Sequence, residues 1–351
     1  MRILGIETSC DETAAAVVED GGKVLSSVVY TQIAKHRPYG GVVPEIACRD
    51  HVRKLPGIVE EALKESDSSW DDIDAIAVTY GPGLGSSLLV GLSGAKALAL
   101  RTGKPLIGVN HLEGHLNSIF LADDVDDPYS VCPMLVLLVS GGHTFVIHVE
   151  KPGSYTILGK TYDDAAGEAL DKGANLLNLG YPGGPYIEKE AAGGDVKFYH
   201  FPRGLGSKGP AHLDGNLNRK LCFSFSGLKT SLLYYLKNNP TVIEDGHMSD
   251  VCASYQEAVC DALIKRVDRA LDSGSYKAFA CVGGVAKNKT LRRKMERRAK
   301  KHGVRLLLTP MQFCTDNAAM IAYTGLLRYQ AGAAVMNPSD INPNLTIESW
   351  R

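Results

Sequence analysis

Short apolar runs separated by small or polar turns recur along the chain and predict paired strands. Arg2–Glu7 has the pattern of a buried strand, and residues 14–18 form a second apolar run after a polar turn. The same arrangement returns at Met134–Val139 and at residues 144–149, on either side of a Ser-Gly-Gly turn. Each pair therefore predicts a strand–turn–strand hairpin.

Two further patterns each occur once in either half of the chain. The first is a buried strand, a glycine-rich turn and a helix, at residues 74–100 and 277–302. The second is a strand that leads into a helix, at residues 105–115 and 304–316. Three patterns in the same order in both halves indicate an internal duplication.

The spacing of matched positions indicates where the two halves differ. Ala278 lies 203 residues after Ala75, and Asp316 lies 205 residues after His111, whereas the two hairpins are only 131 residues apart. The second half therefore has about 72 extra residues. We place this insertion at about residues 163–229.

Alternating strands and helices predict an α/β fold with a parallel or mixed sheet in each of two lobes. A length of 351 residues exceeds that of one ordinary domain. We expect a first lobe at residues 1–130, completed by a C-terminal helix at about 317–351, and a second lobe at 131–316. Ligands of such folds bind outside the carboxyl ends of the strands. Equivalent loops of the two lobes are therefore expected to face each other across a cleft.

Two histidines one helical turn apart form a candidate metal site. His111 and His115 share a helix face because four residues make about one turn, and neutral imidazoles bind zinc and iron. The duplication matches His111 with Asp316, which we expect to supply a third ligand from the second lobe. The alternatives are a pair of surface histidines and, for Asp316, a helix N-cap. A peptidase is not favoured, because Glu113 lies two positions after His111 and points away from the ligand face.

Glycine-rich and hydroxyl-rich turns predict anion binding. Residues 81–85 and 283–288 follow predicted strands and open predicted helices, where backbone N–H groups favour anions. Neither is a P-loop or a dinucleotide fingerprint. The polar turn at residues 7–13 contains Asp11, a candidate for orienting a metal or a nucleophile, whereas its neighbour Cys10 is not expected to be a nucleophile. Ordinary turn chemistry is the alternative for each of these turns.

Positive charge is concentrated in one predicted helix. The net charge of the chain is −1, yet residues 287–305 contain ten Lys or Arg residues and one acid. Such a run is either a solvated helix face or a contact with a nucleic-acid backbone. The candidates for an RNA contact are Arg292, Arg293, Arg297 and Arg298.

Cysteine usage and hydropathy narrow the class of protein. The eight cysteines are scattered and include no CxxC pair, which argues against a structural zinc site or a disulfide framework. No uncharged apolar stretch reaches about 18 residues, and the first residues already have the pattern of a strand rather than a leader peptide. We expect a cytoplasmic protein without a membrane span.

Six motifs together resemble one family. They are GIETSCDET at residues 5–13, GGVVPE at 40–45, HLEGH at 111–115, SGGHT at 140–144, FSFSGLKT at 223–230 and CTDN at 314–317. These motifs are similar to those of the TsaD-type subunit of tRNA threonylcarbamoyladenosine synthesis, in its bacterial and organellar branch. The similarity runs from Met1 to about Ala333.

The resemblance implies a fold and a reaction. The fold is the duplicated actin/hexokinase/Hsp70-like fold, in agreement with the internal repeat. The reaction transfers the threonylcarbamoyl group from L-threonylcarbamoyladenylate to the N6 amine of an adenosine and releases AMP. That adenosine lies immediately 3′ of the anticodon in tRNAs that read codons beginning with A.

The resemblance also implies a site. One divalent metal, usually iron with zinc as the alternative, is bound by His111, His115 and Asp316. The residues that match contacts to the acyl donor are Leu138, Val139, Ser140, Gly141, Gly142, Asp171, Gly184, Glu188 and Asn288. No general base is evident beyond Asp11. The polar stretch at residues 204–220 looks longer than is usual in the family and has no assigned role.

Bacterial members of this family work with a smaller paralogous subunit and an ATPase, and organellar members work as homodimers. Apolar segments at residues 55–63 and 88–100 could form such an interface, with ordinary core packing as the alternative. Two other functions compete with acyl transfer. An ATP-dependent switch of the Hsp70 type would not need both histidines, and a metallopeptidase would need a catalytic glutamate.

Overall fold

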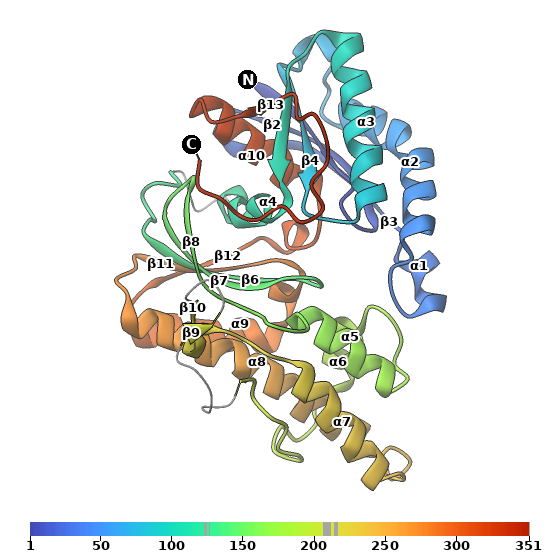
Figure 1. The fold of residues 1–351 in the computed structure, drawn as a ribbon, viewed down its shortest axis with the longest axis vertical. Coiled ribbons are helices and arrows are strands. Elements are labelled where there is room, and N and C mark those ends of the chain that lie inside the picture. The colour runs from blue at the N-terminus through green and yellow to red at the C-terminus, as the bar shows by residue number, and fades with distance from the viewer. Residues whose placement is uncertain (123–124, 126, 206–211, 214–216, 351) are drawn as a thin grey trace. The chain divides into compact units, whose positions relative to one another are not determined.

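The computed structural model describes residues 1–122, 125, 127–205, 212–213 and 217–350, and Figure 1 shows its elements. The chain divides into two compact units. The first contains Met1–Ser130, Pro152–Ser154 and Thr309–Arg351, and the second contains Val131–Lys151 and Tyr155–Leu308. Asp316 therefore belongs to the same unit as His111 and His115, and the expectation that it comes from the second lobe is wrong.

A six-stranded sheet forms the centre of the first unit, in the order β13-β5-β4-β1-β2-β3. The β1–β2 and β2–β3 pairs are antiparallel, and β4 runs parallel to both β1 and β5. The short β13 closes one edge by antiparallel pairing with β5. The strands are Arg2–Glu7 (β1), Glu12–Glu19 (β2), Lys23–Thr31 (β3), Ala75–Gly81 (β4), Leu106–Asn110 (β5) and Val335–Met336 (β13).

Helices cover both faces of this sheet. Leu4 and Ile6 of β1 join the apolar cluster formed with α2 and α3. Gly5, which points to the opposite face because strand side chains alternate, packs against α10. The helices are Ile33–His36 (α1), Pro44–Glu65 (α2), Gly85–Thr102 (α3), His111–Asn117 (α4) and Ala318–Gln330 (α10).

The two apolar segments considered for an interface contribute to this core. Leu55, Ile58, Val59 and Leu63 of α2 are buried in the cluster, as is Leu92 of α3. The alternative of core packing therefore accounts for most of their apolar side chains. Leu89 and Leu100 of α3 remain exposed.

The second unit repeats the topology of the first. Its sheet has the order β12-β11-β6-β7-β8, which matches β5-β4-β1-β2-β3 strand for strand. The β6–β7 pair is antiparallel, and β11 runs parallel to both β6 and β12, as in the first sheet. The strands are Met134–Val139 (β6), Thr144–Lys151 (β7), Ser154–Lys160 (β8), Ala278–Val282 (β11) and Arg305–Leu308 (β12). The predicted duplication is confirmed, and each predicted hairpin has a third strand, β3 or β8, that the sequence pattern missed.

The extra length of the second half lies between β8 and β11. The first half has 43 residues between β3 and β4, and the second has 117 between β8 and β11. This segment contains Ala166–Leu176 (α5), Gly183–Glu190 (α6), Ser226–Asn238 (α7) and Met248–Ser273 (α8), followed after β11 by Lys289–His302 (α9). It also contains the short pair His212–Leu213 (β9) and Leu217–Asn218 (β10). Most of the polar stretch at 204–220 lies outside the described residues.

Short 3-10 helices connect several of these elements, at Asp20–Gly22, Arg37–Tyr39, Trp70–Asp72, Ser118–Leu121, Arg219–Leu221, Gly284–Lys287 and Met311–Phe313. Among the described residues, no helix combines the length and the apolar character that a bilayer crossing would require.

Gly5 permits the close approach of α10 to β1, and we expect its substitution to destabilise the first unit. A Cβ at this position would lie 2.3 Å from the Ala318 carbonyl oxygen. Gly5→Ala should therefore cost about 1–3 kcal/mol or more and lower the thermal unfolding midpoint. The control is Gly57→Ala in α2, where an added Cβ meets nothing within 4 Å and should stabilise by about 0.5–1 kcal/mol. Equal midpoints for the two variants would contradict the packing described for β1.

Candidate functional site

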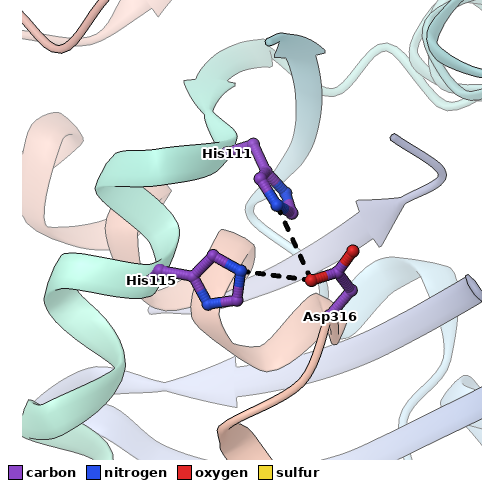
Figure 2. Close-up of side chains that lie close together, drawn as sticks. All are labelled: His111, His115 and Asp316. Carbon is purple, nitrogen blue, oxygen red and sulfur yellow. Dashed lines mark hydrogen bonds and ion pairs between the residues drawn. The ribbon is translucent and has the colours of Figure 1, made fainter. Parts of the chain in front are cut away.

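A capped helix start positions the two histidines. β5 ends at Asn110, whose side-chain oxygen accepts hydrogen bonds from the backbone N–H groups of Leu112 and Glu113. This N-cap begins α4 at His111, so that His111 and His115 extend from one face of the helix, as Figure 2 shows. Their ring centroids are 4.7 Å apart. Both are buried, with exposed fractions of 6% and 0%, which excludes the alternative of surface histidines.

Asp316 completes a group of three side chains in the first unit. Its Oδ1 lies 3.1 Å from Nε2 of His115 and 3.6 Å from Nε2 of His111, and Figure 2 shows the carboxylate turned toward both rings. The three ligand atoms all lie within 4.8 Å of one another. The N-cap of α10 is Asn317, which accepts from the Met320 N–H, so the alternative of an N-cap role for Asp316 is wrong.

A buried glutamate orients the first histidine. Glu7 at the end of β1 is fully buried, and its Oε2 lies 3.0 Å from Nδ1 of His111. The same carboxylate accepts hydrogen bonds from the Thr79 hydroxyl and from the Ser9 N–H. A carboxylate at Nδ1 fixes the proton there and leaves Nε2 facing Asp316. Glu7 was missed by the sequence analysis, although it stands at the carboxyl end of a predicted parallel strand, where ligands of α/β folds bind.

The electrostatics of this group favour a cation. Burial lowers the pKa of His111, but the Asp316 and Glu7 carboxylates outweigh it and raise the pKa to about 9. Burial acts to raise the pKa of Glu7, and His111 holds it below its ordinary value. In the absence of a metal ion, the His111 imidazole is therefore protonated on both ring nitrogens and positively charged at neutral pH. Two carboxylates around one buried imidazole are the environment in which a divalent ion can replace that proton.

The donor set fits a transition metal. Two imidazole nitrogens and one carboxylate oxygen suit zinc and iron. Oδ2 of Asp11, a carboxylate whose pKa is affected by Asp316, is buried and has no hydrogen-bond partner in the described part of the chain. An orphaned polar atom close to such a group indicates that an ion or ordered water belongs there. The residues present thus fit a divalent metal ion.

Asp11 and Cys10 lie in the polar turn after β1. Burial raises the pKa of Asp11, the Cys10 hydrogen bond opposes this, and the Asp316 carboxylate adds to the rise. Burial and the Asp11 carboxylate raise the pKa of the Cys10 thiol well above its ordinary value. The thiolate is therefore disfavoured, and Cys10 is not suited to nucleophilic attack.

Glu113 lies on the opposite side of α4 from the ligands. It is 1% exposed, and its Oε2 accepts from Arg328 of α10, with Nε and Nη2 at 2.8 and 2.7 Å. Its Oε1 accepts from the indole N–H of Trp350 near the C-terminus. The carboxylate is thus committed to internal contacts, which supports the rejection of a peptidase mechanism.

The turn expected to contact the acyl donor lies in the second unit. Leu138 and Val139 are buried at the end of β6, and the turn that follows exposes Gly141 and Gly142. Ser140 closes this turn, because its N–H donates to the His143 carbonyl and its hydroxyl accepts from the His143 N–H. The N–H groups of the two exposed glycines have no acceptor among the described residues.

The other residues expected to contact the acyl donor lie in the second unit, at two places where a side chain of one helix accepts a hydrogen bond from the start of another. Asp171 of α5 accepts from the Gly183 N–H at the start of α6, next to Gly184. Glu188 of α6 accepts from the Lys289 N–H at the start of α9, next to Asn288. Asn288 is the N-cap of α9, and its amide also donates to Gln256 at 2.7 Å. The structure therefore brings α5, α6 and the start of α9 together, with several of these polar groups already engaged in helix capping.

The four arginines predicted to contact RNA are not equivalent. The Arg292 Nε donates to the Ala286 carbonyl at 2.6 Å, and Arg298 forms an ion pair with Asp268 at 3.3 Å. Arg293 and Arg297 are exposed on α9. The sequence alone did not distinguish Arg292 and Arg298, which have partners within the unit, from the exposed Arg293 and Arg297.

Comparison with known proteins shows one family. The family model described as TsaD, tRNA N6-adenosine threonylcarbamoyltransferase, matches residues 23–323. A protein of that name from Thermotoga neapolitana is 46% identical over 347 residues, covering 99% of this chain and 100% of the relative. One from Syntrophobacter fumaroxidans is 48% identical, covering 97% of this chain and 98% of the relative.

Solved structures support the fold. Component A of (R)-2-hydroxyglutaryl-CoA dehydratase from Acidaminococcus fermentans is 17% identical and covers 95% of this chain and 99% of its own, with a TM-score of 0.52. HypF from T. kodakarensis is 16% identical and covers 94% of this chain and 48% of its own, with a TM-score of 0.59. At this identity the likeness concerns the fold alone, and it confirms the actin/hexokinase/Hsp70-like fold expected from the sequence.

Metal uptake should release a proton from His111. Its pKa of about 9 without metal means that the imidazole is protonated at pH 7 and must lose that proton to bind a metal ion. We expect at least about one proton released per metal at pH 7, and an affinity that falls about tenfold per pH unit below pH 9. Calorimetry in two buffers of different ionisation enthalpy measures the release. An affinity independent of pH between 6 and 8 would contradict the charge assignment.

Glu113→Gln should weaken the fold and spare the metal site. The substitution leaves the half-buried Arg328 guanidinium without its carboxylate, and the expected cost lies below the about 3–5 kcal/mol that is typical of a fully buried pair. Thermal unfolding should register this loss, while metal content per chain stays at the wild-type value because Glu113 faces away from the ligands. Loss of metal without loss of stability would instead place Glu113 among the ligands.

Proposed function

We propose that this chain transfers a threonylcarbamoyl group from L-threonylcarbamoyladenylate to tRNA. The chain belongs to the TsaD family of tRNA N6-adenosine threonylcarbamoyltransferases. The acceptor is the N6 amine of the adenosine immediately 3′ of the anticodon in tRNAs that read ANN codons. The observation that carries the proposal furthest is the buried group of His111, His115 and Asp316. It stands in the first unit at the carboxyl end of β5, where α/β folds bind ligands.

The proposed chemistry is a single acyl transfer. The N6 lone pair of adenine attacks the carbamoyl carbon, and a new N–C bond forms. The bond between that carbon and the phosphate oxygen breaks, and AMP leaves with the electron pair. The attacking nitrogen loses one proton, for which Asp11 is the proposed acceptor. A raised pKa supports this role, since a stronger base accepts a proton more readily.

His111, His115 and Asp316 would hold one divalent metal ion per chain, Fe²⁺ in our proposal with Zn²⁺ as the alternative. Such an ion supplies Lewis acidity toward a carbonyl oxygen or a binding point for the threonyl end of the donor. Glu7 would keep His111 in the tautomer that presents Nε2, because it occupies Nδ1.

The acyl donor would contact residues of the second unit. The exposed N–H groups of Gly141 and Gly142 are suited to an oxyanion or a phosphate. Leu138, Val139 and Ser140 shape that turn. Asp171, Gly184, Glu188 and Asn288 would complete the donor site, where the capping contacts of these side chains fix their orientation.

The proposed partners follow from the same family. They are tRNA and either a smaller paralogous subunit with an ATPase, as in bacteria, or a second copy of this chain. The proposed location is the cytoplasm. Exposed Leu89 and Leu100 on α3 are the apolar side chains that such an interface would cover.

Removing any metal ligand should abolish bound metal and transfer. His111→Ala, His115→Ala and Asp316→Ala should each reduce metal affinity strongly. The loss should exceed the about 10–100-fold loss that is typical when a residue hydrogen-bonded to a metal ligand is replaced. Transfer from L-threonylcarbamoyladenylate to tRNA should fall in parallel, with the far-UV circular dichroism unchanged. His148→Ala is the control, because His148 lies on β7 and contacts Glu150 at 3.0 Å.

The same variants separate the competing functions. An ATP-dependent switch predicts ATP turnover that survives the loss of either histidine. A peptidase predicts peptide cleavage that depends on Glu113. Metal bound stoichiometrically by the His111→Ala, His115→Ala double variant would overturn the assignment of the site.

A further inference from the structure

A cavity of about 710 Å³ lies in the second unit between α6, α8 and the part of α9 from Lys289 to Arg297. Its volume is within the range of roughly 300–1,000 Å³ that is usual for ligand sites. Among the residues proposed to contact the acyl donor, its lining includes Glu188 and none of the others. The function proposed above therefore leaves most of this cavity without a role.

Four exposed cations line the cavity. Lys289, Arg293 and Arg297 follow one another at intervals of four residues along α9, which places them on one face of the helix. Lys189 of α6 lines the same cavity. In the part of the chain that the structure describes, none of the four forms an ion pair. Arg293 donates to the Thr290 hydroxyl, which is a neutral group.

The two acids in the lining offset only part of this charge. Glu257 is paired with Lys294, and Glu188 accepts from the backbone N–H of Lys289, so that five Lys or Arg side chains line the cavity against two carboxylates. The first turn of α9 is also occupied, because Asn288 accepts from the Leu291 N–H. The attraction for an anion thus comes from the four side chains rather than from the end of the helix.

Four of the remaining charged or ionisable side chains of α9 have acidic partners on α8. Lys294 lies 2.8 Å from Asp261. Arg298, Lys301 and His302 all approach Asp268 of α8. The helix therefore divides into a face that binds α8 through ion pairs and a face of uncompensated charge that lines the cavity.

We infer that this cavity binds consecutive backbone phosphates of the tRNA, with Lys289, Arg293, Arg297 and Lys189 as the contacting groups. The inference rests on the proposed function. Cations spaced about 6 Å apart along a helix suit a row of phosphates better than one compact anion, on which they would converge. The lining contains no aromatic side chain on which a base could stack, so the contact is to the strand backbone.

A double substitution tests the inference against a matched control. Arg293→Gln, Arg297→Gln removes two charges from the cavity. Lys265→Gln, Lys301→Gln removes two charges from α8 and α9 outside the cavity lining. Binding of a fluorescent tRNA transcript that reads an ANN codon is measured by anisotropy over a series of salt concentrations, with the full chain.

The cavity variant should bind tRNA about tenfold more weakly at low salt, and the slope of log affinity against log salt should fall by about two, one for each phosphate that the variant no longer neutralises. The control should retain the wild-type affinity and slope. Equal losses in both variants, or no loss in the cavity variant, would overturn the inference. If the cavity binds AMP or inorganic phosphate as tightly as it binds tRNA, a free anion is its ligand, and the inference is also overturned.

Transfer assays separate this inference from the function on which it rests. With saturating donor, the cavity variant should need about tenfold more tRNA for half-maximal transfer and should reach the wild-type rate at saturating tRNA. If the wild-type protein transfers no threonylcarbamoyl group, the proposed function fails. If the cavity variant transfers with unchanged tRNA half-saturation, the proposed function stands and the RNA site is wrong.

Discussion

The buried carboxylate of Glu7 imposes the constraint on which the first unit depends. A charge without solvent is tolerated in a protein interior only when it is paired and hydrogen-bonded. Glu7 meets this requirement through Thr79 of β4, the Ser9 N–H and the His111 ring, and so ties β1, β4 and α4 together. With Asp316 on the other side of His111, the group carries more negative charge than one imidazole balances. A proton or a metal ion on the histidines is therefore part of what holds these elements in place.

The helix that carries His111 and His115 is fixed from two sides by one segment of chain. Asp316, just before α10, faces His115, whereas Arg328 near the end of α10 binds Glu113 on the other side of α4. Gly114 allows the two helices to approach, because a Cβ there would lie 2.8 Å from the Ile321 side chain. Each polar or small position of the HLEGH motif thus has a distinct physical role: two present the imidazoles of the proposed metal site, one anchors α10, and one permits close packing. The motif needs no catalytic glutamate to explain its composition.

The sequence predicted the elements whose pattern is local or repeated. Apolar periodicity located β1, β6 and their partners, the spacing of the two histidines identified one face of α4, and the duplication pointed to Asp316. The sequence analysis assigned Asp316 to the wrong unit. The chain returns from the second unit to the first after β12, and an internal repeat does not show where such a return occurs. Glu7 and the division of α9 were also missed. Both depend on partners 30 to 104 residues away, Asp268 for Arg298 and His111 for Glu7, and such distances leave no periodic trace.

The division of α9 also shows how a nearly neutral chain can bind a polyanion. A net charge of −1 provides no general attraction for RNA, so binding must come from local groups whose charge is not cancelled nearby. Acids of α8 compensate one face of α9, whereas the cavity beside the other face is lined by five Lys or Arg side chains and only two carboxylates. Phosphate contacts carry no base information. In the proposed reaction, the cavity would therefore hold any tRNA in position, and the choice of adenosine would depend on groups that contact the base itself.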